Sequence, residues 1–333
     1  MSDALIRTEE DIIQGFLEPL ARGFAGAFGL RDDCAVLAPE PGQELVLKTD
    51  AIAEGVHFFA NDAAADIAWK ALAVNISDLA AKGARPLAYL LALAFPQPPQ
   101  KAWLAQFADG LRIAQDQFGC QLIGGDTDRR PGPMAINITA IGSVPIGQMV
   151  RRGMAKPGDQ LFVTGTLGDA ALGLALRRDA SVAKRWQLTA EQVAHAQSRY
   201  LRPVPRLALT PALRAYASAA MDLSDGLVKD CGRMCAASGV GARIRASDLP
   251  VSAAVSRVVS AEAMWLEKVL AGGDDYELLI AVPPIKVRAF LAATQGLDVP
   301  TTAIGEVTAG QALLVEGPNG EPVSLPRTGY DHF

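Results

Sequence analysis

The chain has little cysteine and little histidine, and both shortages limit its chemistry. Its four cysteines are Cys34, Cys120, Cys231 and Cys235. They form no C-x-x-C pair, so we expect no disulfide scaffold and interpret them as small buried residues of a reducing compartment. Its three histidines are His57, His195 and His332. Their wide spacing argues against a zinc site built from histidines.

The common phosphate-binding and nucleophile motifs are also missing. The sequence contains no G-x-x-x-x-G-K-[ST] loop and no G-x-G-x-x-G between a predicted strand and helix. It also lacks the G-x-S-x-G elbow and the protein-kinase motif set. Any phosphate chemistry must therefore use another arrangement of residues.

Nothing in the sequence predicts a leader peptide, a membrane span or a nucleic-acid surface. The first ten residues contain Asp3, Glu9 and Glu10 and no apolar h-region, and the most apolar stretch, 86–98, is too short to span a bilayer. The net charge of −5 and the pI near 5.3 exclude non-specific attraction to nucleic acid or anionic membrane. We expect a cytoplasmic protein.

Length and pattern predict two α/β (α+β) domains with mixed sheets packed with helices. The chain has 333 residues, half of them hydrophobic, which is enough for two cores. Predicted strands alternate with predicted helices in both halves. We place the boundary near residue 150, with an N-terminal domain at 1–150 and a C-terminal domain at 151–333.

Local patterns give the expected elements. Residues 4–28 predict an amphipathic helix followed by a glycine-containing loop, and 64–82 carry apolar residues at helical spacing. A short strand is expected at 121–123, running into the turn-like segment Gly-Gly-Asp-Thr. Residues 178–200 are interpreted as a polar stretch without a defined element.

Aspartates recur at the predicted ends of elements. They are Asp32, Asp33, Asp50, Asp78, Asp126, Asp222, Asp225, Asp274 and Asp275. Any one of them could be a helix cap or a turn residue. Several follow apolar runs directly, however, and strand ends of α/β proteins meet at the ligand-binding crevice. Clustered carboxylates need bridging cations, and hard oxygen ligands suit magnesium. The set predicts magnesium-assisted phosphate chemistry.

Two of the candidate residues could also have a purely structural role. Asp78 lies within a helical pattern, three residues after Asn75, where it is either exposed or part of a metal site. His57 precedes Phe58 and Phe59, so it either contacts a ligand or packs in the protein.

Eight segments, in this order along most of the chain, resemble thiamine-monophosphate kinases. They are D-D-C-A-V-L at 32–37, T-D with E-G-V-H-F at 49–58, K-A-L-A-V-N-I-S-D-L-A-A-K-G-A at 70–84, L-I-G-G-D-T at 122–127, K-P-G-D with V-T-G-T-L-G-D-A-A-L-G-L at 156–174, M-D-L-S-D-G-L at 221–227, G-G-D-D-Y-E-L at 272–278 and G-Y-D-H-F at 329–333. Each segment alone is a weak signal, whereas their common order is a strong one.

The resemblance implies a reaction, a fold and a set of roles. The reaction is ATP plus thiamine monophosphate giving ADP plus thiamine diphosphate, with Mg²⁺. The implied fold is that of aminoimidazole ribonucleotide synthetase, with an ATP- and magnesium-binding N-terminal domain that forms a homodimer and a C-terminal domain that completes the active site. The substrate phosphate is then the nucleophile, so no catalytic His or Cys is needed.

The same resemblance assigns the residues. Magnesium ligands would be Asp33, Thr49, Asp50, Asp78, Asp126, Asp222 and Asp225, of which Asp126 and Asp225 are also the catalytic pair. ATP contacts would be Gly125, Asp126, Arg151 and Ser224. Thiamine monophosphate contacts would be His57, Asp274 and Tyr330.

Two positions depart from the family pattern. Arg31 stands where a glycine is usual, and Lys48 stands where a Ser or Thr metal ligand is frequent. A protonated lysine cannot ligate magnesium, so each cation either supplies charge near the phosphates or points to solvent. Because of Lys48, a second hypothesis stays open: the protein could bind a nucleotide or thiamine phosphate without catalysing a reaction. Two other enzymes of the fold, selenophosphate synthetase and a hydrogenase maturation factor, are disfavoured because residues 1–33 and the C-terminus lack cysteine.

Overall fold

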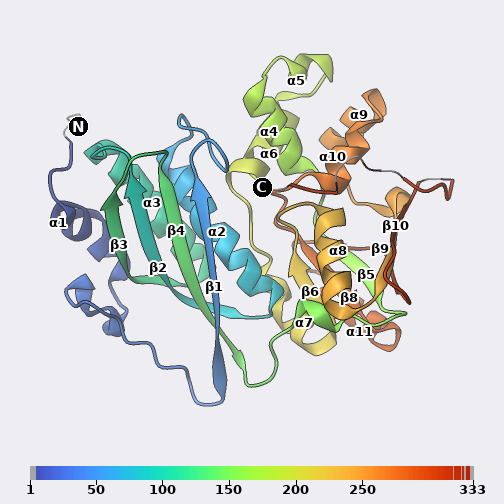
Figure 1. The fold of residues 1–333 in the computed structure, drawn as a ribbon, viewed down its shortest axis with the longest axis horizontal. Coiled ribbons are helices and arrows are strands. Elements are labelled where there is room, and N and C mark those ends of the chain that lie inside the picture. Colours follow the sequence, from blue (N-terminus) through green and yellow to red (C-terminus); the bar gives the residue numbers. More distant parts are fainter. Residues whose placement is uncertain (1–4, 318, 324, 326–327, 331–333) are drawn as a thin grey trace. The chain divides into compact units, whose positions relative to one another are not determined.

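A computed structural model describes residues 5–317, 319–323, 325 and 328–330, which form two compact units (Figure 1). The N-terminal unit comprises residues up to 79 together with 84–147. The C-terminal unit comprises residues 80–83 and the chain from 148 onward. Each unit has its own sheet, so the predicted α/β class with two mixed sheets packed by helices is confirmed.

The N-terminal unit contains a four-stranded sheet in the order β1-β4-β2-β3. Its strands are β1 (Gln43–Ala53), β2 (Arg85–Phe95), β3 (Gln121–Arg129) and β4 (Ala135–Pro145). Strand β4 runs antiparallel to β1 and β2, while β2 and β3 are parallel. Parallel neighbours need a long crossover, and α3 (Lys101–Phe118) provides it between β2 and β3.

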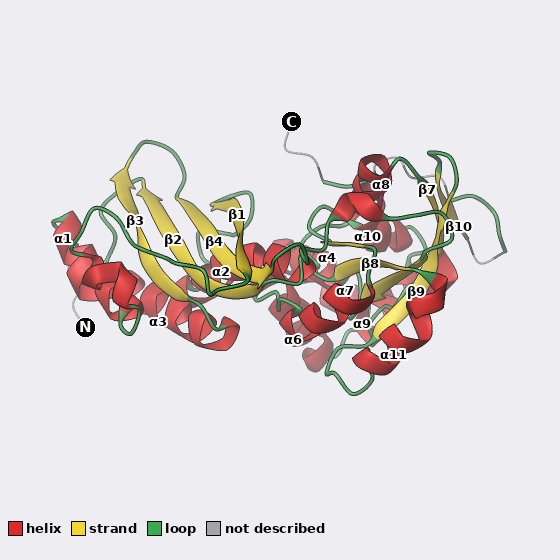
Figure 2. Cartoon of the chain, turned by 90° about the horizontal axis from the view of Figure 1, so that it is seen from below, coloured by secondary structure: helices red, strands yellow, loops and turns green. Residues whose placement is uncertain are grey.

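Two long helices lie on one face of this sheet. Figure 2 shows α2 (Ala64–Ala81) and α3 on the same side of the strands. Apolar residues of α2 such as Leu72, Ile76 and Leu79 are fully buried. Helix α3 ends at Gly119, which takes the left-handed conformation that glycine adopts without a steric penalty.

The predicted amphipathic helix within 4–28 is shorter and less regular than expected, with consecutive helical turns over 9–21. The segment forms short turns: α1 (Glu9–Ile12), the π-helix η1 (Ile13–Leu17) and the 3₁₀ turns η2 (Glu18–Ala21) and η3 (Ala25–Leu30). Glycine and proline interrupt the pattern, and Pro19 lies in η2. Apolar spacing alone did not reveal these breaks.

The expectation that the aspartates end their strands holds for Asp222 and fails for Asp50 and Asp126. Asp222 is the last residue of β6 (Ala219–Asp222). Asp50 lies inside β1, and β3 continues through Asp126 to Arg129. Both β1 and β3 are edge strands, where a charged side chain can reach solvent while the backbone stays paired.

The C-terminal unit contains a six-stranded sheet in the order β10-β7-β9-β5-β8-β6. Its other strands are β5 (Gln160–Thr164), β7 (Gly241–Arg245), β8 (Leu278–Val282), β9 (Thr301–Thr308) and β10 (Leu313–Glu316). Only the β10–β7 pair among these neighbours is parallel in the described chain.

Helices cover both faces of this sheet. They are α4 (Asp169–Arg178), α5 (Val182–Arg185), α6 (Ala190–Leu201), α7 (Thr210–Tyr216), α8 (Leu227–Ser238), α9 (Ala253–Ala261), α10 (Trp265–Ala271) and α11 (Val287–Thr294). Successive residues of β8 enter different cores: Leu279 joins the one with α4, α8, α9 and α10, whereas Ile280 joins the one with α7 and α11. A strand buried on both faces explains the continuous apolar run Leu278–Val282.

The interpretation of 178–200 as an undefined polar stretch is wrong. Helix α6 starts with a capping box in which Thr189 and Gln192 satisfy each other's backbone N–H groups. The polar composition of this segment gave no sign of the helix, which buries Ala196, Arg199 and Tyr200.

No helix in the described part of the chain has the length and apolarity needed to cross a membrane.

Candidate functional site

In the N-terminal unit, Lys48 joins two of the predicted metal ligands. Its Nζ lies 3.1 Å from Asp50 Oδ2 and 2.8 Å from Asp78 Oδ2. The Lys48 side chain is 29% exposed, so its ammonium group is directed to these carboxylates and not out into solvent. Burial alone would lower the pKa of Lys48, but the two carboxylates outweigh it and raise the pKa to about 12.

The buried side chain of Asn75 holds strand β1 against helix α2. The backbone N–H of Asp50 donates to Asn75 Oδ1 at 2.8 Å, while Asn75 Nδ2 donates to the carbonyl of Ala71 at 3.0 Å. Asn75 and Asp78 are three apart on α2 and therefore share a helix face. Asp78 forms an ion pair with Lys48, an arrangement that neither predicted alternative, exposure or a metal site, included.

Thr49 and Asp126 belong to the opposite face of the sheet. Thr49 Oγ1 donates to Asn137 Oδ1 at 3.2 Å. Asn137 pairs with Ala92, which pairs with Asp126, so these residues lie in one row across the strands. Because strand residues alternate in direction, Lys48 and Asp50 face α2 while Thr49 faces away from it. Asp126 is exposed.

Gly125 allows β3 to pass close to β2. A Cβ atom at this position would lie 1.8 Å from the carbonyl oxygen of Leu91. Only glycine fits this approach, which keeps Asp126 in register beside Ala92.

His57 lies in the loop after β1 and is half-buried. Its Nδ1 accepts a hydrogen bond from the backbone N–H of Ala53 at 3.0 Å, and the carbonyl of His57 accepts one from Lys70 Nζ at 2.9 Å. A ring nitrogen that accepts is unprotonated, so the remaining proton is on Nε2. The Nδ1 bond supports the packing interpretation of His57, and its contact with a substrate stays a prediction.

Asp33 and Arg31 lie apart from this cluster in the chain segment between η3 and β1. Asp33 is exposed. Arg31 Nη2 is 3.7 Å from Glu18 Oε1, and the Arg31 side chain is 79% exposed. Of the two alternatives for Arg31, its position favours solvent.

In the C-terminal unit, the loop after β6 holds three predicted residues. Asp222 is buried at the strand end, and Ser224 and Asp225 follow it. The backbone N–H groups of Ser224 and Asp225 both donate to Asp230 Oδ2, at 3.1 and 2.9 Å. Burial raises the pKa of Asp230 to about 6 despite these bonds and the nearby Arg233.

Two cations flank the Asp225 carboxylate. Arg233 Nη1 lies 2.6 Å from Asp225 Oδ2 and 2.8 Å from Asp230 Oδ1. Lys229 Nζ lies 3.7 Å from the same Asp225 oxygen. Arg233, Lys229 and Asp230 were missed from the sequence, although the three-residue spacing of Asp230 and Arg233 on α8 was a usable signal.

Backbone hydrogen bonds bring the predicted substrate residues to this loop. Asp274 N–H donates to the carbonyl of Ser224 at 2.9 Å, and Tyr330 N–H donates to the carbonyl of Asp225 at 3.0 Å. Lys229 Nζ donates to the Tyr330 carbonyl. Four predicted site residues, Ser224, Asp225, Asp274 and Tyr330, therefore adjoin one another.

Two further acids in the segment 272–277 are buried and were not predicted to have these roles. Glu277 accepts from Arg199 Nη2 at 2.7 Å, from Arg206 Nε at 2.7 Å and from Thr164 Oγ1 at 2.6 Å. Asp275 accepts from the backbone N–H of Gly168 at 2.9 Å, and burial raises its pKa to about 7. These acids anchor the segment that carries Asp274.

Arg151, a predicted ATP contact, is exposed just before η4 (Arg152–Met154), and its Nη2 is 3.3 Å from Met154 Sδ. Within the described part of the chain, no three His, Cys, Asp or Glu side chains are arranged to hold a metal ion.

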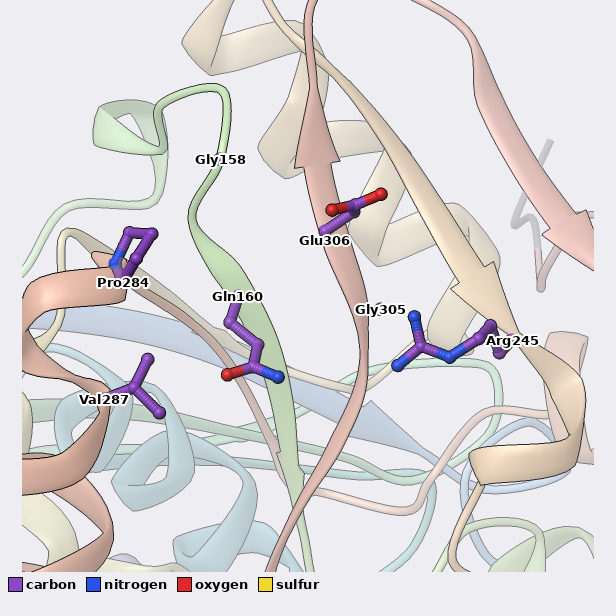
Figure 3. A pocket seen from close by; sticks show the side chains of 7 residues that line it. All are labelled: Gly158, Gln160, Arg245, Pro284, Val287, Gly305 and Glu306. Carbon is purple, nitrogen blue, oxygen red and sulfur yellow. The ribbon is translucent and has the colours of Figure 1, made fainter.

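A separate pocket of about 340 Å³ opens in the C-terminal unit (Figure 3). It is lined by Gly158, Gln160, Arg245, Pro284, Val287, Gly305 and Glu306. None of these is a predicted site residue, and the carboxylates described above lie outside it.

Comparisons with known proteins agree with the fold and with the motifs. Residues 31–144 match AIR synthase related protein, N-terminal domain, and residues 156–316 match AIR synthase related protein, C-terminal domain. Thiamine-monophosphate kinase of Escherichia coli K12 is 45% identical over 92% of this chain and 91% of its own length.

Two solved structures are similar over most of their length. The crystal structure of thiamine-monophosphate kinase from Stenotrophomonas maltophilia is 39% identical, with a TM-score of 0.81 and coverage of 96% of this chain and 98% of its own. AaThiL complexed with AMPPCP and TMP is 30% identical, with a TM-score of 0.76 and coverage of 89% of each chain. The ordered motifs, both domain matches and these relatives agree, and the chain belongs to the thiamine-monophosphate kinase family.

Proposed function

We propose that this protein transfers the terminal phosphoryl group of ATP to thiamine monophosphate, giving ADP and thiamine diphosphate. The observation that carries the proposal is the joining of Ser224, Asp225, Asp274 and Tyr330 by backbone hydrogen bonds. The relatives named thiamine-monophosphate kinase support the reaction. The related structure with AMPPCP and TMP supports ATP and thiamine monophosphate as the two substrates.

Magnesium is the proposed metal, and the candidate ligands have the donor atoms that it prefers. All candidate ligands offer oxygen, and magnesium commonly takes one or two carboxylates and completes its shell with water and phosphate oxygens. Asp222 and Asp225 would hold it in the C-terminal unit, and Asp33, Thr49 and Asp126 in the N-terminal unit. Asp50 and Asp78 do not fit as an open pair because Lys48 lies against both. When bound, magnesium neutralises charge on the phosphates.

The protein's own residues orient the reactants. The phosphate of thiamine monophosphate is anionic at neutral pH and attacks in line without a strong base. We assign Asp126 and Asp225 as the catalytic residues, Gly125, Asp126, Arg151 and Ser224 to ATP, and His57, Asp274 and Tyr330 to thiamine monophosphate. Since Asp274 and Tyr330 are bonded to the loop that carries Asp225, substrate and metal contacts hold a fixed relation to each other.

Turnover by the purified full-length chain tests the proposal. ADP and thiamine diphosphate should form in equal amounts, only when ATP, thiamine monophosphate and Mg²⁺ are all present, and EDTA should stop the reaction. Titration calorimetry with and without Mg²⁺ measures binding of both substrates in parallel. Binding of both without any ADP would identify a non-catalytic binding protein instead.

Two further properties belong to the proposal. We propose a homodimer formed through the N-terminal unit, supported by the exposed Leu47 and Leu90 on the sheet of that unit. Light scattering after size-exclusion chromatography would measure its mass. We also propose a cytoplasmic location, supported by the four free thiols of the chain.

A further inference from the structure

We propose that the ammonium group of Lys48 lies between Asp50 and Asp78, in the space that a divalent ion would otherwise fill. This chain then binds one metal ion fewer at its N-terminal carboxylates than a chain with a neutral residue at position 48. The inference rests on the proposed function because it concerns which groups supply positive charge for that reaction.

The distances identify Lys48 as the partner of both carboxylates. Nζ lies 3.1 Å from Asp50 Oδ2 and 2.8 Å from Asp78 Oδ2, which are distances of charge-assisted hydrogen bonds. A magnesium ion would need oxygens at about 2.0–2.1 Å, and a protonated amine has no lone pair to donate to it. The ammonium group and a metal ion therefore exclude each other at this point.

Backbone contacts between β1 and α2 position Lys48, Asp50 and Asp78 relative to one another. Side chains alternate in direction along β1, so Lys48 and Asp50, which are two residues apart, both face α2. Asn75 accepts from the Asp50 N–H at 2.8 Å and is itself fully buried, which locks the strand to the helix. One helical turn further along α2, Asp78 is then held opposite Lys48.

Charge gives the consequence for metal binding. Two carboxylates that share one site repel unless a cation lies between them. Lys48 supplies a single positive charge, which leaves the trio with a net charge of −1. It does so at every Mg²⁺ concentration, whereas a metal ion would leave as the concentration falls.

Metal stoichiometry tests this directly, on the full-length protein without nucleotide or substrate. Bound Mn²⁺ is counted by electron paramagnetic resonance for wild type, Lys48→Ser, the charge-preserving control Lys48→Arg, and Lys48→Ser combined with Asp78→Asn. We expect Lys48→Ser to bind one more ion per chain than wild type. Lys48→Arg and the double variant should bind the wild-type number.

Thermal unfolding provides a second measurement. In EDTA, Lys48→Ser should unfold at a lower temperature than wild type because its carboxylates repel, and Mg²⁺ should restore the loss. Lys48→Arg should show no such restoration. Equal ion counts for folded Lys48→Ser and wild type would overturn the inference.

Wild type gives a test that does not depend on Lys48→Ser folding. If Lys48 fills the site, Asp78→Asn in the otherwise unchanged chain should bind as many Mn²⁺ ions as wild type, and the loss of one ion would overturn the inference. These counts need no turnover. Absence of kinase activity would therefore refute the proposed function while leaving the ion counts to decide on Lys48.

Discussion

The backbone N–H of Asp274 donates a hydrogen bond to the carbonyl oxygen of Ser224 at 2.9 Å. Two neighbouring bonds run in parallel with it, from Tyr276 N–H to Leu223 and from Leu223 N–H to Glu277. Asp274 and Tyr276 both have positive φ, at 70° and 50°, which is costly for residues with side chains. The surrounding bonds hold this strained segment against the loop that carries Asp225.

Gly273→Ala should impair activity through this contact. A Cβ at position 273 would lie 2.5 Å from the Ser224 carbonyl oxygen, so the two segments must separate. A displacement of about 1 Å at a site can cost roughly 100-fold in rate, so we expect kcat/KM for thiamine monophosphate to fall by about that factor.

Gly232→Ala on α8 is the matched control. A Cβ there would meet only Leu313 Cδ2, at 3.9 Å, and alanine is the better helix former. Activity and melting temperature should stay at wild-type values. If Gly273→Ala also retained wild-type kcat/KM, the Asp274–Ser224 contact would have no role in positioning the substrate.

Asp126→Asn and Asp225→Asn should each lower kcat by roughly 100-fold or more, since an amide is a poor magnesium ligand and lacks the charge. Asp126 is exposed, so its substitution should leave the melting temperature unchanged. The exposed Asp116→Asn on α3 serves as a control in both assays. Wild-type turnover in either variant would remove that residue's assigned role.

Glu277→Gln should destabilise the C-terminal unit. The buried carboxylate neutralises Arg199 and Arg206, and an uncompensated buried charge typically costs roughly 3–5 kcal/mol. Denaturant unfolding of the variant would measure this loss. Glu191→Gln, exposed on α6, should change the free energy of unfolding little. A near-wild-type value for Glu277→Gln would show that the network contributes nothing to stability.

Asp275 should make the stability of the protein fall as pH rises from about 4 to about 7. Burial raises its folded pKa from 3.8 to about 7, so between these values the folded state binds the extra proton. Linkage then gives a loss of up to about 1 kcal/mol per pH unit from this group. The loss is absent below pH 4 and complete above pH 7.

The variant Asp275→Asn removes the titration and keeps an acceptor for the Gly168 N–H. Its free energy of unfolding should therefore decline less than that of wild type over this pH interval. Parallel stability curves for the two proteins would contradict a raised pKa at Asp275.

Several features were accessible without the structure because they depend on local sequence. Alternating strand and helix patterns predicted the fold class, and aspartates after apolar runs predicted the acidic set. Motif order predicted the reaction, and helical spacing predicted α2. Breaks in the segment 4–28 and the helix α6 were missed, since glycine, proline and a capping box outweighed apolar periodicity there. Asp126 was predicted just after a short strand at 121–123, yet Gly125 permits close pairing with Leu91 and the strand continues through Asp126.

By itself, the sequence determined that this is an acidic, two-sheet protein with the ordered motifs of its family, and it marked Lys48 as unusual. Only the tertiary structure decided what Lys48 does. Its partner Asp78 is thirty residues away along the chain, and whether the two meet depends on the register of β1 against α2. The same holds for Glu277 and its two arginines. Such long-range pairs form only when tertiary packing brings distant segments together, and no fixed sequence spacing predicts them.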